Sequence, residues 1–384
     1  MLAAALLTAA GPAPGRELRR SGLFLRPLLM GDANVAVADE ASGLYYNPAA
    51  LANLVDGSVE AFSPQIFLDE TVRLAILDPD SLQDRYQDLD EQAFRDLLGE
   101  TVYAQFNIRM PVVAVPQKNF AIGLVAEALA YAEVLQNPVL PGLRLEVALD
   151  EILFATFAFN LSDHVALGFT PKVVNRVGID KFFSFGELFV GGDTLDLEDR
   201  PEFKQFADGT QYAVPGLDLG LLFRFPFWPG WHPRLGVSML NIGGYDADEG
   251  LLGMEFGERP SPFEPPVAGE LRQLNSVGVA VSPMWHGIRY TLALDVVDVT
   301  RSALPGPDWA RRTKLGLEVG VFPHEDGTAL FSLLFGLNAT HRSMGFLSRV
   351  WIFELGAGVY RVELGENAGD RPDDRSVFIF GFRF

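Results

Sequence analysis

Cysteine is absent from this chain of 384 residues. Without a thiol the protein forms no disulfide, no thiolate metal site or iron–sulfur cluster, and no cysteine nucleophile. Basic residues are also scarce, because 30 Lys and Arg face 50 Asp and Glu, which gives a formal net charge of −20. A surface of that sign repels phosphates, so we predict no nucleic-acid partner.

Long apolar runs are missing as well. The mean hydropathy is +0.16, yet no uncharged apolar run reaches the roughly 18 to 20 residues that a membrane-spanning helix needs. The composition is nevertheless 48% hydrophobic, with 30 Phe and 38 Gly, which excludes a disordered chain. Any crossing of a membrane must therefore use strands.

The N-terminal stretch 1–15 is an apolar run that ends in small residues and has no basic residue before its apolar part. This pattern is similar to the apolar region and cleavage zone of a secretory signal. We expect residues 1–13 to be the remainder of a signal peptide, with a disordered N-terminus as the alternative.

From about residue 57 the chain consists of short segments in which apolar and small or polar residues alternate. Breaks rich in Gly, Pro and Asp separate these segments, which is typical of antiparallel strands. We predict an all-β chain of about fourteen strands, with twelve or sixteen as alternatives. The predicted strands cover residues 57–68, 101–115, 119–131, 143–160, 164–177, 213–226, 233–243, 271–282, 287–299, 311–322, 328–338, 343–349, 352–363 and 376–384.

The predicted connections alternate in length. Long connections such as 69–100 and 178–212 are separated by short ones such as 116–118 and 161–163. Outer-membrane barrels have short periplasmic turns and longer external loops, whereas a soluble sandwich has no reason to sort its loops in this way. The pattern predicts a transmembrane antiparallel β-barrel in the bacterial outer membrane and disfavours a soluble secreted β-protein.

The last predicted strand, 376–384, carries phenylalanine at alternate positions, including Phe380, Phe382 and the final Phe384. It resembles the C-terminal signal that the barrel assembly machinery recognises in outer-membrane barrels. An ordinary buried C-terminal strand is the alternative.

Residues 30–51, MGDANVAVADEASGLYYNPAAL, precede the first strand and do not alternate. This stretch resembles the N-terminal segment of the FadL-type outer-membrane transporter superfamily, which includes the PorV-like and TraF-like barrels. The match includes Asp39, Ala41–Ser42 and Tyr45–Ala49, whereas Asp32–Asn34 and Ala50 depart from the usual pattern. Stretches 335–338 and 363–371 are also similar to the PorV/TraF-like branch.

The resemblance implies that residues 14–56 form a hatch inside a barrel built from residues 57–384. The residues assigned to the hatch are Asp39, Tyr45, Tyr46, Asn47, Pro48 and Ala49. Proline fixes its φ and asparagine bonds neighbouring backbone, so a fixed turn is expected whether the hatch moves as a gate or only positions the segment. Six lumen-facing charges are expected to form structural pairs rather than an ion pathway: Asp218, Arg224, Arg234, Asp295, Lys314 and Glu318.

Two outer connections are unusually apolar. In 69–100, residues Leu82, Tyr86, Leu89, Ala93 and Leu97 have helical spacing, which predicts an amphipathic helix or a lid on the barrel mouth. Connection 178–212 carries a candidate ligand-binding cluster of Phe182, Phe183, Phe185, Leu188 and Phe189. The resemblance supports this interpretation, because external-loop helices form the first ligand site in FadL-type transporters.

Pro111 interrupts an otherwise regular predicted strand, where it removes a ladder hydrogen bond. FadL-type barrels release ligand sideways through a strand kink, so the resemblance makes Pro111 a candidate kink. A bulge at the barrel rim is the alternative.

Catalytic motifs are absent. The five histidines are scattered without metal-ligand spacing, and there is no G-x-S-x-G or phosphate-binding loop, so we expect no enzyme, no metal and no cofactor. The resemblance implies a passive channel for hydrophobic small molecules such as long-chain fatty acids. The alternative is a PorV-like docking or shuttle protein whose partner serves protein secretion or envelope assembly. We expect a monomer in contact with outer-membrane lipid and lipopolysaccharide, because a closed barrel has no free edge.

Overall fold

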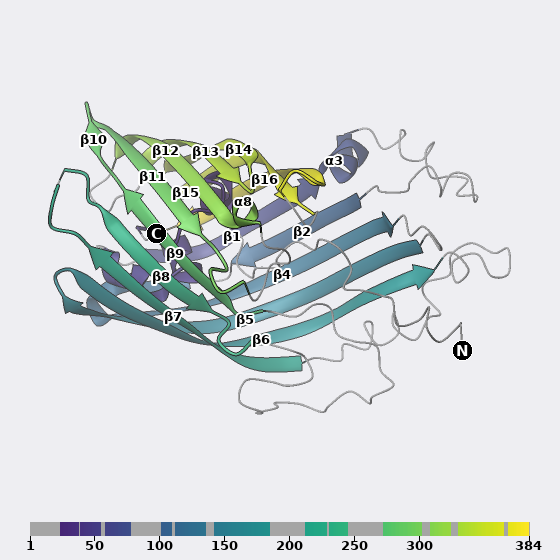
Figure 1. The fold of residues 1–384 in the computed structure, drawn as a ribbon, viewed down its shortest axis with the longest axis horizontal. Coiled ribbons are helices and arrows are strands. Elements are labelled where there is room, and N and C mark those ends of the chain that lie inside the picture. The colour runs from purple at the N-terminus through teal and green to yellow at the C-terminus, as the bar shows by residue number, and fades with distance from the viewer. Residues whose placement is uncertain are drawn as a thin grey trace.

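A ring of strands around an N-terminal segment makes up this computed structural model (Figure 1). The structure describes residues 24–37, 39–54, 58–77, 101–109, 112–135, 142–184, 212–228, 230–244, 272–301, 308–323, 329–364 and 368–383. Before the first strand lie helix α2 (Leu25–Leu29) and two 3-10 turns, η1 (Ala41–Tyr45) and η2 (Pro48–Asn53).

Fourteen antiparallel strands close the wall, which confirms the predicted fold class and strand number. Their segments are β1 (Ser58–Asp69), β2 (Thr101–Arg109), β3 (Val112–Val115), β4 (Phe120–Leu135), β5 (Gly142–Ser162), β6 (Val165–Ser184), β7 (Tyr212–Arg224), β8 (Arg234–Leu240), β9 (Leu274–Val281), β10 (Met284–Trp285), β11 (Ile288–Val296), β12 (Thr313–Pro323), β13 (Ala329–Asn338), β14 (His341–Val350), β15 (Phe353–Glu363) and β16 (Pro372–Arg383). Segments β2 and β3 together form one wall strand, and the two-residue β10 extends the turn before β11. Pairing of β1 with β16 and of β9 with β11 makes the ring continuous.

The two faces of the wall differ as the sequence alternation predicts. On β12, Leu315 is 42% exposed whereas the adjacent Lys314 is only 7% exposed. The same contrast holds on β5, where Leu153 is 51% exposed and Ile152 is 3% exposed. Because successive strand residues point to opposite faces, the apolar outer positions form a lipid-facing belt and the polar positions face the lumen.

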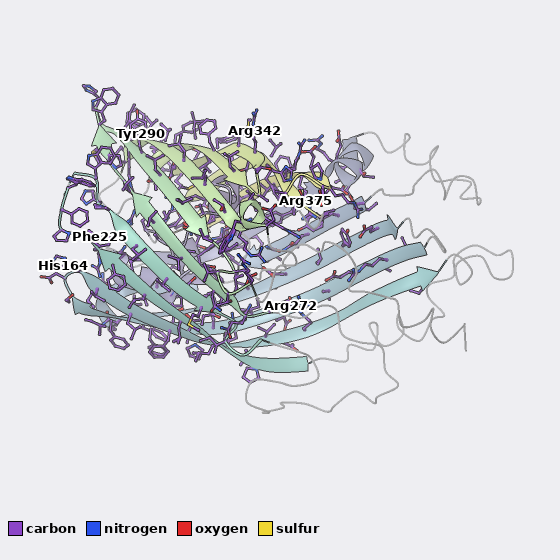
Figure 2. The ribbon with its side chains drawn as sticks, in the orientation of Figure 1. His164, Phe225, Arg272, Tyr290, Arg342 and Arg375 are labelled. Carbon is purple, nitrogen blue, oxygen red and sulfur yellow. The ribbon has the colours of Figure 1, made fainter. Side chains whose placement is uncertain are left out.

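Most short turns lie at one end of the barrel, where β16 also ends, and the long connections leave the other end (Figure 1). The two-residue turn between β13 and β14 is an exception, because it lies at the end with the long connections. Aromatic side chains are exposed at the short-turn end, including Trp228 at 69% and Trp351 at 94%. Phe225 and His164 lie at this same end (Figure 2). Aromatic residues at the edge of an apolar belt are typical of the membrane interface of outer-membrane barrels.

The largest difference between a predicted strand boundary and the structure is at the end of β6. Strand β6 was expected to end at residue 177 but continues to Ser184, so Phe182 and Phe183 lie in a strand and not in a loop. The reason is pairing: β5 extends equally far, and Arg144 and Leu143 lie opposite Phe182 and Phe183. Each strand thus satisfies the backbone groups of the other, although Gly178 and Asp180 resemble a turn signal.

Helix α3 (Glu70–Leu77) follows β1 directly. It begins where Asp69 Oδ1 accepts a hydrogen bond of 2.7 Å from the Val72 N–H, which satisfies a donor of the first turn. The amphipathic helix predicted over Leu82–Leu97 lies outside the described residues. No helix in the described ranges is long and apolar enough to cross a membrane.

Two further short elements complete the described chain. A 3-10 turn, η3 (Pro116–Lys118), joins β3 to β4, and helix α8 (Trp309–Arg312) precedes β12. Asp308 begins α8 by accepting a hydrogen bond of 2.8 Å from the Ala310 N–H.

Candidate functional site: the plug and its contacts with the wall

The segment 24–54, which we call the plug, fills part of the lumen. Its helix α2 has only five residues and no side-chain cap at its N-terminus, so it is too short to be stable by itself. Tertiary contacts hold it instead: Leu25 is 1% exposed, and its N–H donates a 3.1 Å hydrogen bond to Gln65 Oε1 of β1. Burial against the wall therefore determines the local structure of the plug.

Eight glycines of the wall, the glycine belt, lie where the plug passes. A Cβ atom added to Gly336 would be 1.9 Å from the Gly31 nitrogen, and one added to Gly168 would be 2.3 Å from the Pro48 carbonyl carbon. The glycines are cross-strand partners in the pairs Gly168/Gly220, Gly236/Gly278, Gly316/Gly336 and Gly345/Gly358. At Gly168, Gly220, Gly236, Gly316 and Gly336 the missing side chain lets main chain of the plug reach the strand directly, whereas at Gly345 and Gly358 the nearest plug atoms belong to the side chain of Leu29.

Asn47 joins the plug to itself and to the wall. Its Oδ1 accepts a 3.1 Å hydrogen bond from the Ala49 N–H at the start of η2. Its Nδ2 donates to the carbonyl oxygens of Val35, at 2.9 Å, and of Leu221 on β7, at 3.1 Å. This one side chain thus starts a turn, links two parts of the plug and fastens both to β7.

Tyr46 makes a different contact within the plug. Its hydroxyl donates a 2.8 Å hydrogen bond to Asp32 Oδ1. Tyr46 is 3% exposed, so the bond lies in a shielded region and fixes the loop that carries Asp32, a residue with a left-handed φ of 68°.

The lumen-facing carboxylate of Asp295 also holds the plug. Its Oδ2 accepts hydrogen bonds from the Asn34 N–H at 2.6 Å and the Val35 N–H at 2.8 Å. Other lumen charges pair within the wall: Lys172 contacts Asp218 at 2.8 Å. The predicted structural use of the lumen charges is confirmed for Asp218, Asp295 and Glu318.

A chain of buried ion pairs surrounds Arg26 in the plug. Its guanidinium donates to Asp39 at 2.6 Å and to Glu318 of β12 at 2.5 Å. Asp39 also contacts Arg289 of β11 at 2.5 Å, and Glu40 contacts Arg349 of β14 at 2.5 Å. We call the group formed by Arg26, Asp39, Glu40, Arg289, Glu318 and Arg349 the ion network. It ties the plug to three wall strands.

The ion network keeps its plug carboxylates ionised. Burial would raise the pKa of Asp39, but the guanidinium groups of Arg26 and Arg289 hold it well below its ordinary value. Burial has the same raising effect at Glu40, and there Arg26 and Arg349 lower the pKa to about 2. Opposite charges close to a carboxylate favour its ionised form, and here they outweigh desolvation.

The low pKa of Glu40 predicts that its contribution to the free energy of unfolding persists in mild acid. A carboxylate whose pKa is depressed in the folded state stabilises the protein fully above its ordinary pKa of 4.5, and the contribution is lost as the pH falls through about 2. The difference in free energy of unfolding between wild type and Glu40→Gln should therefore be the same at about pH 7 and pH 5 and should shrink toward pH 2. Urea unfolding in lipid measures it. A difference that disappears between pH 7 and pH 5 would show that Glu40 is not held in this way.

An apolar cluster lies between the plug and the wall. The ring of Tyr45 is 4.5 Å from that of Phe24 and 5.1 Å from that of Phe154, measured between centroids. Buried aliphatic side chains of β3 to β6 pack around Phe154. They are Val112, Val125, Ile152 and Val174. This apolar cluster gives the lumen a hydrophobic face beside the plug.

The wall is interrupted next to the apolar cluster. Segment β2 ends at Arg109 and β3 begins at Val112, and Pro111 itself lies outside the described residues. Opposite β4, the register changes from Arg109 facing Val125 to Val113 facing Ile122. Between these two pairs the chain advances four residues from β2 to β3 but only three residues on β4. The β2–β3 side of the pairing therefore contains one extra residue, as in a β-bulge.

Tyr45 and Arg109 each bring a polar atom to this region. The Tyr45 hydroxyl and Arg109 Nε are buried, and neither has a hydrogen-bond partner in the described part of the chain. Burial raises the pKa of the Tyr45 hydroxyl well above its ordinary value, and Glu60 and Glu127 add to that effect against the opposing influence of Arg109. The hydroxyl is therefore a protonated donor.

The structure describes only part of the other predicted sites, so the proposed ligand-binding cluster stays a prediction. Phe183 is completely buried on β6, while Phe185, Leu188 and Phe189 lie outside the described residues. Phe380 and Phe382 of β16 stack with Phe353 of β15, and Phe380 is 46% exposed on the lipid side. Phe384 lies outside the described residues. Among the described residues no group of His, Asp and Glu is arranged to hold a metal ion.

Sequence reasoning located Asp39, Tyr45 and Asn47 but missed Arg26, Arg109 and the glycine belt. A signal for the belt was present, because glycine recurs at lumen-facing positions of predicted strands, as at Gly168 and Gly220. Arg26 gave no comparable signal, since it is a single basic residue in an irregular segment.

Comparison with known proteins agrees with this geometry. No protein-family model matches the chain, and no curated protein matches its sequence. Among solved structures it is similar to the ΔS2 mutant of the TodX monoaromatic hydrocarbon channel, with a TM-score of 0.51, 9% identity, and coverage of 94% of this chain and 99% of that chain. The toluene transporter TbuX of Ralstonia pickettii gives a TM-score of 0.47, 11% identity, and coverage of 94% and 98%. A Pseudomonas aeruginosa FadL homologue gives 0.44, 11%, and coverage of 97% and 99%.

The closed wall, the apolar outer belt and the plug define a plugged β-barrel of the bacterial outer membrane. Its fold is that of the FadL-type outer-membrane channels, as the likeness to the TodX channel shows. The resemblance inferred from residues 30–51 is thereby confirmed for the fold, and the PorV/TraF-like branch stays a prediction.

Proposed function

We propose that this protein is a passive channel that lets small hydrophobic molecules cross the outer membrane. The observation that carries the proposal is the apolar cluster, which gives the lumen a hydrophobic face where the plug meets an interrupted wall strand. The shared fold with a hydrocarbon channel supports it. Long-chain fatty acids are one ligand class within this proposal.

The position of the plug favours one side of the barrel as the route for a hydrophobic molecule. Its main chain lies against glycines of β6 to β8, β12 and β13, where a Cβ would overlap main-chain atoms of the plug. On the side of β3 to β6, the apolar cluster packs aliphatic side chains of the wall against the ring of Tyr45. Because side chains change rotamer far more readily than packed main chain moves, a hydrophobic molecule would pass along the apolar cluster. The interruption between β2 and β3 is the proposed strand kink at its exit.

Neighbouring residues of β5 provide a matched test. Ile152 faces the lumen and is 3% exposed, whereas Leu153 faces lipid and is 51% exposed. We expect Ile152→Trp to slow the entry of naphthalene into proteoliposomes several-fold, because the larger ring fills the route. Leu153→Trp should leave the rate unchanged, because that ring enters the lipid.

Equal rates for wild type, both variants and empty liposomes, with all three barrels folded, would overturn the channel proposal. The alternative, a docking protein for secretion or envelope assembly, requires no passage through the lumen. That result would favour it, and affinity capture with the intact barrel would then be used to find the partner.

A further inference from the structure

Two donors without acceptors lie at the apolar cluster. The Tyr45 hydroxyl belongs to the plug and Arg109 Nε to the end of β2, and both atoms are shielded from solvent without a partner in the described residues. Leaving a buried donor unpaired is costly, so native proteins keep few of them. A pair of such donors indicates a place where another molecule supplies the acceptor.

One aromatic ring connects the two residues. The Arg109 guanidinium carbon lies 4.4 Å from the centroid of the Phe24 ring, and the same ring is 4.5 Å from that of Tyr45. Arg109 is also the last residue before the interruption of the wall strand. The two donors therefore lie at the polar edge of the apolar cluster, beside the proposed exit.

The charges beside the two donors determine whether an anionic or a neutral acceptor is favoured. The guanidinium of Arg109 is already paired with Glu60 at 2.5 Å and lies 3.8 Å from Glu354. Glu127 is near enough to Tyr45 to act on its hydroxyl. These carboxylates would repel an entering anion, whereas a neutral oxygen could accept from the two donors without that repulsion.

We propose that Tyr45 and Arg109 form a polar subsite that selects hydrophobic molecules bearing a neutral acceptor oxygen, such as aromatic carbonyl compounds. This inference rests on the proposed channel function and narrows its substrate class, because it places neutral oxygen compounds ahead of plain hydrocarbons and ionised fatty acids. The ring of the ligand packs against the apolar cluster, and its oxygen accepts from the Tyr45 hydroxyl and from Arg109 Nε. A plain hydrocarbon leaves both donors unpaired, and a carboxylate is repelled.

Three probes of one size test the subsite: benzaldehyde carries a neutral acceptor, toluene carries none, and benzoate is an anion. Their binding to the full-length barrel in lipid nanodiscs is measured by equilibrium dialysis, with empty nanodiscs subtracted. We expect benzaldehyde to bind at least about tenfold more tightly than toluene, because its oxygen gains one neutral hydrogen bond from Tyr45 and one charge-assisted hydrogen bond from Arg109, and benzoate to bind weakest. Tyr45→Phe should weaken benzaldehyde binding several-fold, because only the Arg109 donor remains for the oxygen, and should leave toluene binding unchanged.

Tyr46→Phe is the matched control. Its hydroxyl bonds Asp32, so its removal should leave the preference for benzaldehyde intact. Equal binding of toluene and benzaldehyde to wild type, or a preference that is undiminished in Tyr45→Phe, would overturn the subsite and leave the channel proposal standing. Failure of the folded barrel to bind any of the three probes would overturn both.

Discussion

Replacement of Arg26 by methionine is expected to lower the free energy of unfolding by about 3–5 kcal/mol, the range measured when one partner of a buried ion pair is removed. The cause is the set of carboxylates that Arg26 serves. Asp39 and Glu318 both accept hydrogen bonds from its guanidinium, and Glu40 lies 3.4 Å from it. Methionine fills a similar length of the cavity but supplies no charge, so these groups would repel one another in a buried region.

The loss should be seen first in the plug, because Arg26 links it to β12 directly and the remaining partners of Asp39 and Glu40 lie on other strands. Urea unfolding gives the free energy, and limited proteolysis reports whether the plug becomes accessible before the barrel opens.

Arg361→Met is the control for Arg26→Met. Arg361 pairs with Asp374 at 2.6 Å, but the two side chains are 41% and 55% exposed. Exposed pairs contribute about 0–1 kcal/mol, so the control should change stability little. Equal effects of the two substitutions would show that the ion network does not hold the plug.

Adding a single methyl group to the glycine belt is expected to have the second large effect. In Gly336→Ala the new Cβ would lie 1.9 Å from the Gly31 nitrogen and 2.5 Å from its Cα, both main-chain atoms of the plug. Overpacking in a tight interior costs about 1–3 kcal/mol and sometimes more. Since no flexible side chain can move aside here, we expect a loss of about 3 kcal/mol or displacement of the plug.

Gly320→Ala provides the comparison on the neighbouring strand β12. Its Cβ would be 2.9 Å from the Cβ of Ala329, and no plug atom is among its nearest neighbours. Proteolysis of the plug should be faster in Gly336→Ala than in Gly320→Ala, while both proteins form barrels that migrate as folded species in gels without heating. Equal resistance of the plug to proteolysis in both variants would contradict the close contact between plug main chain and Gly336.

Arg26→Met and Gly336→Ala also distinguish two ways in which the plug is held in the barrel. Arg26 acts through charge, so its effect depends on the carboxylates remaining ionised. Gly336 acts through the absence of a side chain, so its effect should be the same across the pH range. We expect a plug held in both ways to stay in place within the barrel, and we expect the hydrogen bonds of Asn47 to β7 and to Val35 to contribute to this.

The wall of the barrel could be predicted from the sequence alone. The alternation on 164–177 and 311–322 assigned one face to lipid and the other to the lumen, and counting such segments gave fourteen strands, which the sorting of short and long connections supported. Such patterns are local, because the pleat of a strand fixes which way each side chain points without reference to any other strand. The segment 30–51 was likewise identified from residues adjacent in the chain.

The contacts inside the wall could not be predicted in this way, because they join residues that are far apart in the chain. Arg26 and Glu318 are 292 positions apart, and the contact of Gly336 with Gly31 depends on closure of the whole ring. The continuation of β6 to Phe183 likewise followed from pairing with β5, against the local turn signal. Register and closure between distant strands set these contacts, and alternation within one strand contains no information about either.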